Sequence, residues 1–195
     1  MERARLLTFT ILLAIAGLTG CAGAVVVGGT AGTLAVAHDR RTPGTILEDE
    51  TIELKAYSAI GDDPGLEDQA HVRVTSYNMV VLLTGEAPTA SLRERAERLV
   101  AAVPRVRRVY NEIRVEPPSS FSTRTRDAWL AAKVKVRLFD VDLEDFDPLR
   151  VKVISSHGTV YLMGLLTRAE ADAVVEVVRT TGGVEKVVKL FEYLG

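Results

Sequence analysis

Gly158-Thr159-Val160-Tyr161-Leu162-Met163-Gly164 is one of two stretches that decide the fold of this chain. The other has the same pattern and comes earlier: Met79-Val80-Val81-Leu82-Leu83-Thr84-Gly85. Each is a short apolar run, rich in β-branched residues, that ends in glycine. Such runs are typical of buried strands. An alternating strand candidate precedes each run, with Asn78 or His157 at the turn between them, so each copy is predicted to form a β-hairpin.

The two hairpins belong to a longer repeat. A helical pattern precedes each hairpin, over residues 49–60 in the first copy and 127–138 in the second. After each hairpin come a second helical pattern and a third strand candidate, residues 109–115 and then 187–193. Each copy therefore has the order helix, strand, strand, helix, strand. This predicts an α+β fold made of two tandem copies of one small module.

Polar residues at the expected helix starts suggest how the helices of the second copy are capped. Asp127 is expected to be the N-cap of the first of these helices. Thr167 is followed three residues later by Glu170, which is the spacing of a capping box, and predicts the start of the second.

Composition fits a globular protein and argues against one class of partner. The chain has 195 residues, of which 47% are hydrophobic and 26% are charged, enough for one ordinary domain or two small ones. A module of about 70 residues buries little core by itself, so we expect the two copies to dock on each other or to pack against a shared linker. The net charge of -2 lacks the strong basic excess of a nucleic-acid binder, and we expect no nucleic-acid partner.

The N-terminus has the layout of an export signal. Arg3 and Arg5 precede an uncharged apolar run over residues 6–16, which is too short to span a bilayer. The run leads to Leu18-Thr19-Gly20-Cys21, which resembles the lipobox of bacterial lipoproteins and contains the only cysteine. We therefore expect residues 1–20 to be a signal peptide and Cys21 to be acylated. A buried free thiol is the alternative.

These signals give a provisional division of the chain. Residues 21–45 are expected to be a lipidated tether, 46–117 the first module, 118–123 a linker and 124–195 the second module. Ala22 follows the cysteine where aspartate would retain an enterobacterial lipoprotein at the inner membrane. The expected location is therefore the periplasmic face of the outer membrane.

Four stretches together make the chain resemble the dual BON-domain outer-membrane lipoproteins: residues 39–45, 109–114, 127–130 and 160–165. The resemblance implies a three-stranded mixed sheet packed on two helices in each module. It also implies a non-enzymatic envelope protein that binds anionic phospholipid through its second module and supports outer-membrane integrity, with relatives at the division site. One departure is Asn78-Met79, which replaces the family's turn glycine, although asparagine can still adopt the left-handed conformation.

The residues themselves indicate where lipid would bind. On a helical wheel, Leu130, Val134 and Leu138 form the stripe that meets the sheet, and the only tryptophan lies off that stripe among cations. Indole rings and basic side chains both favour an anionic membrane interface. The predicted phospholipid-binding residues are Trp129, Arg126, Lys133, Val136 and Arg137. The alternative is a tryptophan that covers the edge of a small core, with solvated charges around it.

Module charges also favour the second copy. Residues 48–116 hold 9 Lys and Arg against 13 Asp and Glu, whereas residues 122–195 hold 11 of each. Anionic lipid should therefore meet less repulsion at the second copy.

No catalytic or cofactor-binding pattern emerges from the sequence. The acidic loop at residues 140–148 has Asp145 where a calcium loop requires glycine, and the three histidines lack metal-ligand spacing. We expect no enzyme activity, no metal and no cofactor. The alternative function is a membrane-tethered adaptor that binds envelope proteins without recognising a specific lipid.

Overall fold

The computed structural model describes residues 39–194, so the predicted signal peptide, Cys21 and most of the predicted tether lie outside the described residues. No helix within residues 39–194 combines the length and hydropathy needed to cross a bilayer. The first copy comprises α3 (Pro43–Gly61), α4 (Pro64–Gln69), β1 (His71–Tyr77), β2 (Val80–Ala87), α5 (Ala90–Ala101), β3 (Arg108–Asn111) and β4 (Arg114–Val115). The second comprises α6 (Phe121–Arg137), the short 3-10 helices η1 (Leu138–Asp140) and η2 (Pro148–Arg150), β5 (Lys152–Ser156), β6 (Thr159–Leu166), α7 (Arg168–Arg179) and β7 (Lys186–Tyr193).

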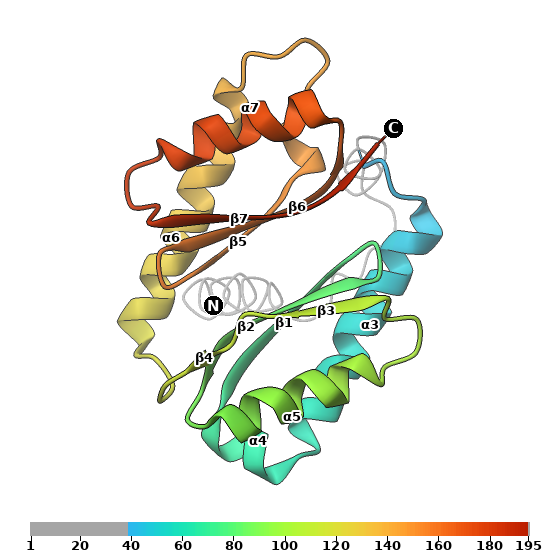
Figure 1. The fold of residues 1–195 in the computed structure, drawn as a ribbon, viewed down its shortest axis with the longest axis vertical. Helices are drawn as coiled ribbons and strands as arrows, with labels where there is room; N and C mark the ends of the chain where they lie inside the picture. Colours follow the sequence, from blue (N-terminus) through green and yellow to red (C-terminus); the bar gives the residue numbers. More distant parts are fainter. Residues whose placement is uncertain (1–38, 195) are drawn as a thin grey trace, which may run out of the picture. The chain divides into compact units, whose positions relative to one another are not determined.

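The two copies have the same sheet topology, which confirms the expected mixed sheets. The strand orders are β1-β2-β3 and β5-β6-β7, with an antiparallel hairpin and a parallel third strand in each. Even the register repeats: Val81 pairs with Ser76 and Val109, and Val160 pairs with Ser155 and Val187. Helices α3 and α5 cover one face of the first sheet, and α6 and α7 cover one face of the second (Figure 1).

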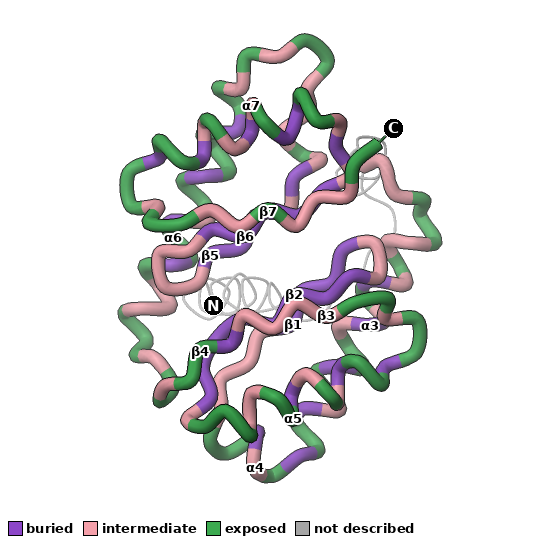
Figure 2. The backbone as a smooth tube through the Cα atoms, viewed as in Figure 1, coloured by how far each residue is buried: buried purple, intermediate pink, exposed green. Residues whose placement is uncertain are grey.

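The central strands are largely apolar, over residues 80–83 and 160–163, because both of their faces are buried there (Figure 2). In β2, Val81 and Leu83 belong to the core beneath α3 and α5, whereas Leu82 faces the other way. In β6, Leu162 packs toward the helices and Met163 faces away from them. Because a strand alternates its side chains between two faces, a run with no polar interruption indicates burial on both.

The faces turned away from the helices form a third core that the two modules share. It contains Tyr77, Val80, Leu82, Ile154, Tyr161 and Met163, all 9% exposed or less. Fully burying one such side chain contributes on the order of 1.5–3 kcal/mol. The expected docking of the two copies therefore takes place through their sheets.

The glycine that ends each apolar run permits a close backbone approach. Gly85 has φ +111°, and a Cβ there would lie 1.9 Å from the carbonyl oxygen of His71. A Cβ on Gly164 would lie 2.8 Å from the carbonyl oxygen of Arg150. Both positions lie near the backbone at the start of the preceding strand, so a side chain would push the hairpin apart.

A buried aspartate in the first helix of each copy holds the hairpin turn. Asp49 accepts hydrogen bonds from the backbone N–H groups of Asn78 and Met79, each at 2.7 Å. Both residues have positive φ, 52° and 62°, so the turn forms without glycine. Asp127 accepts from the N–H groups of His157 (2.9 Å) and Gly158 (3.3 Å) in the same way.

The role predicted for Asp127 is therefore wrong. It lies inside α6 with 9% exposure, and the N-cap is Ser120, whose hydroxyl accepts from the N–H of Thr123. Helix α3 likewise begins earlier than expected, at Pro43, with Thr42 as its N-cap. In both helices the first buried residue comes six positions after the start, Asp49 after Pro43 and Asp127 after Phe121, so the buried stripe that marked the helices begins only after the true N-terminus.

The third strand of the first copy is interrupted, whereas a continuous strand was expected. The amide of Asn111 donates to the carbonyl of Arg93 (3.0 Å) and to Glu97 (2.9 Å) in α5. Ile113 turns into the core and is 3% exposed. β4 then resumes the parallel pairing with β2, opposite Glu86 and Ala87.

The predicted capping box at the start of α7 is confirmed, and its glutamate also binds a residue near the start of the described chain. Glu170 accepts from the N–H of Thr167 (2.8 Å) and forms a bidentate pair with Arg40 (2.7 and 2.8 Å). Burial alone would raise the pKa of Glu170, but the hydrogen bonds from Arg40 and Thr167 lower that pKa to about 2. The segment before α3 is thereby attached to the second module.

Candidate functional site: a groove along α6

Helix α6 has an apolar face toward its sheet and further apolar side chains on the outside. The predicted stripe is confirmed: Leu130, Val134 and Leu138 are 8%, 0% and 1% exposed. On the outside, Trp129 is 73% exposed and Val136 is 68% exposed. The tryptophan therefore does not cover the edge of the core, and its indole is open to solvent.

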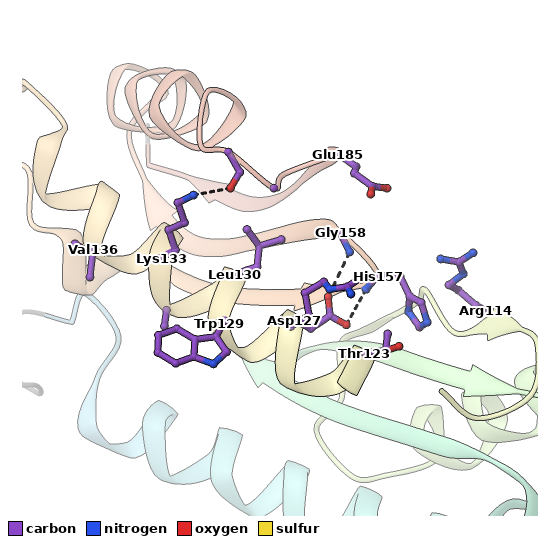
Figure 3. Close-up of a pocket in the computed structure, with 14 residues that line it drawn as sticks. Arg114, Thr123, Asp127, Trp129, Leu130, Lys133, Val136, His157, Gly158 and Glu185 are labelled. Atoms are coloured by element: carbon purple, nitrogen blue, oxygen red, sulfur yellow. Dashed lines mark hydrogen bonds between the residues drawn. The ribbon is translucent and has the colours of Figure 1, made fainter. Parts of the chain in front are cut away.

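A groove runs beside this outer face (Figure 3). Its cavity is about 780 Å³, which falls within the range of small-molecule sites. Four of the predicted residues line it: Trp129, Arg126, Lys133 and Val136. The far wall is built from the loop between α7 and β7, including Gly182, Gly183 and Glu185, and the end is formed by Arg114, His157 and Gly158.

The fifth predicted residue, Arg137, does not line the groove. Its guanidinium donates to the carboxylate of Asp140 in η1, one turn further along the chain. Both side chains are about half exposed, at 45% and 55%. A partly solvated ion pair of this kind offers little free charge, so Arg137 contributes less to an anion site than the sequence suggested.

The cations in the groove differ in how they are held. Lys133 Nζ donates to the carbonyl oxygen of Gly182 at 2.8 Å, which ties α6 to the loop between α7 and β7. Arg126 is exposed and forms no hydrogen bond or ion pair with any of residues 39–194. Its guanidinium is therefore available to an anionic ligand without breaking an existing contact.

The polar floor of the groove is fixed by the same contacts that hold the second hairpin. Asp127 and the turn at His157 and Gly158 are linked by the hydrogen bonds drawn in Figure 3. His157 has φ 50°, which confirms its expected place in the turn. Glu185 also lines the groove, so the basic residues do not form a purely cationic surface.

Sequence reasoning missed Arg114, which lines the groove, and Phe121, an exposed aromatic side chain at the start of the same helix. Phe121, at the start of α6, is 78% exposed and lies eight residues before Trp129, a spacing that keeps both toward the same side of a helix. It was missed because the helix was expected to begin at Asp127. Arg114 comes from β4 of the first module, and no spacing within one copy could place it in the groove of the other.

Comparison with known proteins agrees with this architecture. Residues 48–117 and 126–195 each match the family model described as the BON domain. The chain is 40% identical over 178 residues to outer membrane lipoprotein DolP of Haemophilus influenzae, covering 91% of this chain and 90% of that protein. It is 36% identical over 156 residues to a 21 kDa hemolysin of Actinobacillus pleuropneumoniae, covering 80% of this chain and 79% of that protein.

Likeness to solved structures is weaker. CdsD, a structural protein of the type III secretion system of Chlamydia trachomatis, aligns with 72% of this chain and 91% of its own, at 13% identity and a TM-score of 0.29. That score carries no argument about this fold. The two domain matches and the extensive identity to DolP show instead that the chain belongs to the BON-domain family, as a dual BON-domain protein similar to the outer membrane lipoprotein DolP.

Proposed function

We propose that this protein is anchored to the outer membrane through acylated Cys21 and binds anionic phospholipid along the α6 groove. The outer-membrane location follows from the family and from its similarity to a lipoprotein of that membrane. The role is one of binding rather than catalysis. By family resemblance, we extend the proposal to outer-membrane integrity and to action at the division site.

The observation that carries the proposal is the exposure of Trp129 beside Arg126, a cation that has no charged partner among residues 39–194. An indole that is 73% exposed loses contact with water if it enters the headgroup region, where tryptophan is favoured. Arg126 lines the same groove and can pair with a lipid phosphate without losing a partner among the described residues. Apolar insertion and phosphate pairing would thus act at one place.

The lipid anchor and the groove would support each other. Attachment through Cys21 would keep the second module near the bilayer at a high effective concentration, so even a weak groove could remain occupied. Two or three acyl chains on one cysteine would make the attachment permanent, whereas the groove would bind and release.

Vesicle co-sedimentation tests the proposal on a soluble form that begins at Asp39. We expect pelleting with phosphatidylglycerol vesicles and little with phosphatidylcholine vesicles. Trp129→Ala should weaken binding by about 30-fold, since burying a large apolar side chain contributes about 2 kcal/mol. Arg126→Glu should have a similar effect at low salt, because it removes one favourable charge and adds an unfavourable one, each worth about 1 kcal/mol.

Matched controls come from the first module. Leu54 in α3 is 72% exposed, and the side chain of Arg98 in α5 is 67% exposed, so Leu54→Ala truncates an exposed apolar side chain and Arg98→Glu reverses an exposed charge, both away from the groove. They should leave pelleting unchanged. If the unsubstituted soluble form fails to pellet with anionic vesicles, the tethered adaptor becomes the better account, with the groove as a protein-binding surface.

A further inference from the structure

A cluster of metal-binding side chains lies where the two modules meet, at the end of the α6 groove and away from Trp129 and Val136. His157 Nε2 in the turn between β5 and β6 lies 3.2 Å from Glu86 Oε1 and 3.0 Å from Glu116 Oε1. Glu86 is the penultimate residue of β2, the central strand of the first module, and Glu116 follows β4. The three ligand atoms all lie within 4.8 Å of one another.

Glu86 is a buried carboxylate without a permanently charged partner. Its side chain is only 3% exposed, and its contacts within residues 39–194 are His157 and His71, whose Nδ1 lies 3.3 Å from Oε2. No lysine or arginine among those residues pairs with it. A buried carboxylate is costly unless a positive charge compensates it, and a neutral imidazole supplies none. A divalent cation would supply the compensating positive charge.

The imidazole of His157 is positioned to present Nε2 to such an ion. The residue's backbone N–H is held by Asp127, and its Nδ1 lies 3.3 Å from Ser156 Oγ. When Nδ1 donates to that hydroxyl, Nε2 carries a lone pair and lies 3.2 and 3.0 Å from the two carboxylate oxygens. Metal-binding histidines are commonly oriented by a hydrogen bond from their second nitrogen in this way.

We propose that His157, Glu86 and Glu116 bind one Zn²⁺ ion at the junction of the modules. Tetrahedral zinc with bonds of about 2.0–2.1 Å holds its ligand atoms roughly 3.3 Å apart. The two histidine–carboxylate separations, 3.0 and 3.2 Å, need little adjustment to reach that spacing. Nitrogen and oxygen donors of these types are common zinc ligands, and three of them leave a fourth position for water.

Arg114 is the group that competes with the ion. Its Nε lies 3.2 Å from Glu116 Oε1, the oxygen that also faces His157. The side chains of Arg114 and Glu116 are 51% and 33% exposed, so the guanidinium can move into solvent or to the other oxygen. Bound zinc would replace this partly solvated ion pair with bonds that connect the first module to the turn of the second.

Zinc titration of the soluble form that begins at Asp39, followed by calorimetry, tests the proposal. We expect one equivalent of Zn²⁺ to bind and the thermal midpoint to rise. His157→Asn and Glu86→Gln should each weaken binding by at least tenfold. Asparagine suits the positive φ of position 157, so that turn should survive. Glu144→Gln, in the acidic loop, is the matched control and should bind zinc as the unsubstituted protein does.

Two results would overturn the proposal: no saturable binding to the unsubstituted protein, or binding that both ligand substitutions leave intact. Should either variant fail to fold, Co²⁺ replaces the variants as the probe in the unsubstituted protein. Cobalt at this site should give the intense visible absorption of tetrahedral coordination, at one equivalent and displaced by zinc. A spectrum identical to that of hydrated cobalt would contradict the site. Neither measurement involves lipid, so the outcome is independent of the proposed function.

Discussion

The ion pair between Arg40 and Glu170 makes the free energy of unfolding depend on pH, by an amount that follows from the pKa of Glu170. The side chain of Glu170 is 7% exposed, and its pKa falls from an ordinary 4.5 to about 2 in the folded protein. One pKa unit corresponds to 1.36 kcal/mol, so the lowered pKa represents roughly 3 kcal/mol of folding free energy. Because the folded-state pKa is depressed, this contribution is present above about pH 4.5 and is lost as pH falls toward 2.

Glu170→Gln isolates that contribution, because glutamine keeps the shape and an acceptor for the Thr167 N–H but cannot ionise. Urea unfolding of both proteins at several pH values between 7 and 2 gives the difference in their free energies of unfolding. Other carboxylates titrate in both proteins and cancel in the difference. We expect the advantage of the unsubstituted protein to shrink by roughly 3 kcal/mol between pH 5 and pH 2. A difference that stays constant with pH would refute the reasoning.

Two further substitutions test the hairpins. Asp127→Ala should lower the free energy of unfolding by about 2–4 kcal/mol, since it removes the acceptor for the N–H groups of His157 and Gly158. Equilibrium urea unfolding measures this change. An effect below about 1 kcal/mol would contradict the role given to the aspartate. Gly85→Ala should lower the free energy of unfolding by more than about 3 kcal/mol, because its Cβ would collide with the backbone of β1. Gly61→Ala is the control and should be nearly neutral, because its Cβ meets nothing within 4 Å. Equal melting temperatures for the two variants would count against this explanation.

Local sequence patterns predicted the repeat well because they reflect forces that act within one hairpin or one helix. The apolar runs ending in Gly85 and Gly164 indicated strands of a hairpin, and the structure explains the pattern, since both faces of these strands are buried and each glycine permits a close backbone approach. The outward direction of Trp129 followed from the helical period alone. Once Leu130 was assigned to the core, its neighbour could not also point there.

Features that depend on contacts between distant residues were not predictable. The groove needs Arg114 from the first module, and the cluster around His157 needs Glu86 from β2, so neither can be seen within one copy of the repeat. Asp127 was mistaken for an N-cap because aspartate suits helix starts, while its real partners lie about thirty residues away in the turn. Arg137 differs from these cases, because its partner Asp140 is only three residues away: the short helix η1 that follows α6 brings the two side chains together, and the helical pattern that ended at residue 138 did not predict it.

Fluorescence of Trp129 tests the central claim most directly, because it is the only tryptophan in the chain. The measurement uses the soluble form with phosphatidylglycerol vesicles whose acyl chains carry bromine, a short-range quencher. The account predicts that emission shifts to the blue on binding and is quenched by the brominated chains, with much smaller effects in phosphatidylcholine. Emission that stays at its solvent-exposed wavelength and unquenched while the protein pellets with the vesicles would show that lipid binds elsewhere.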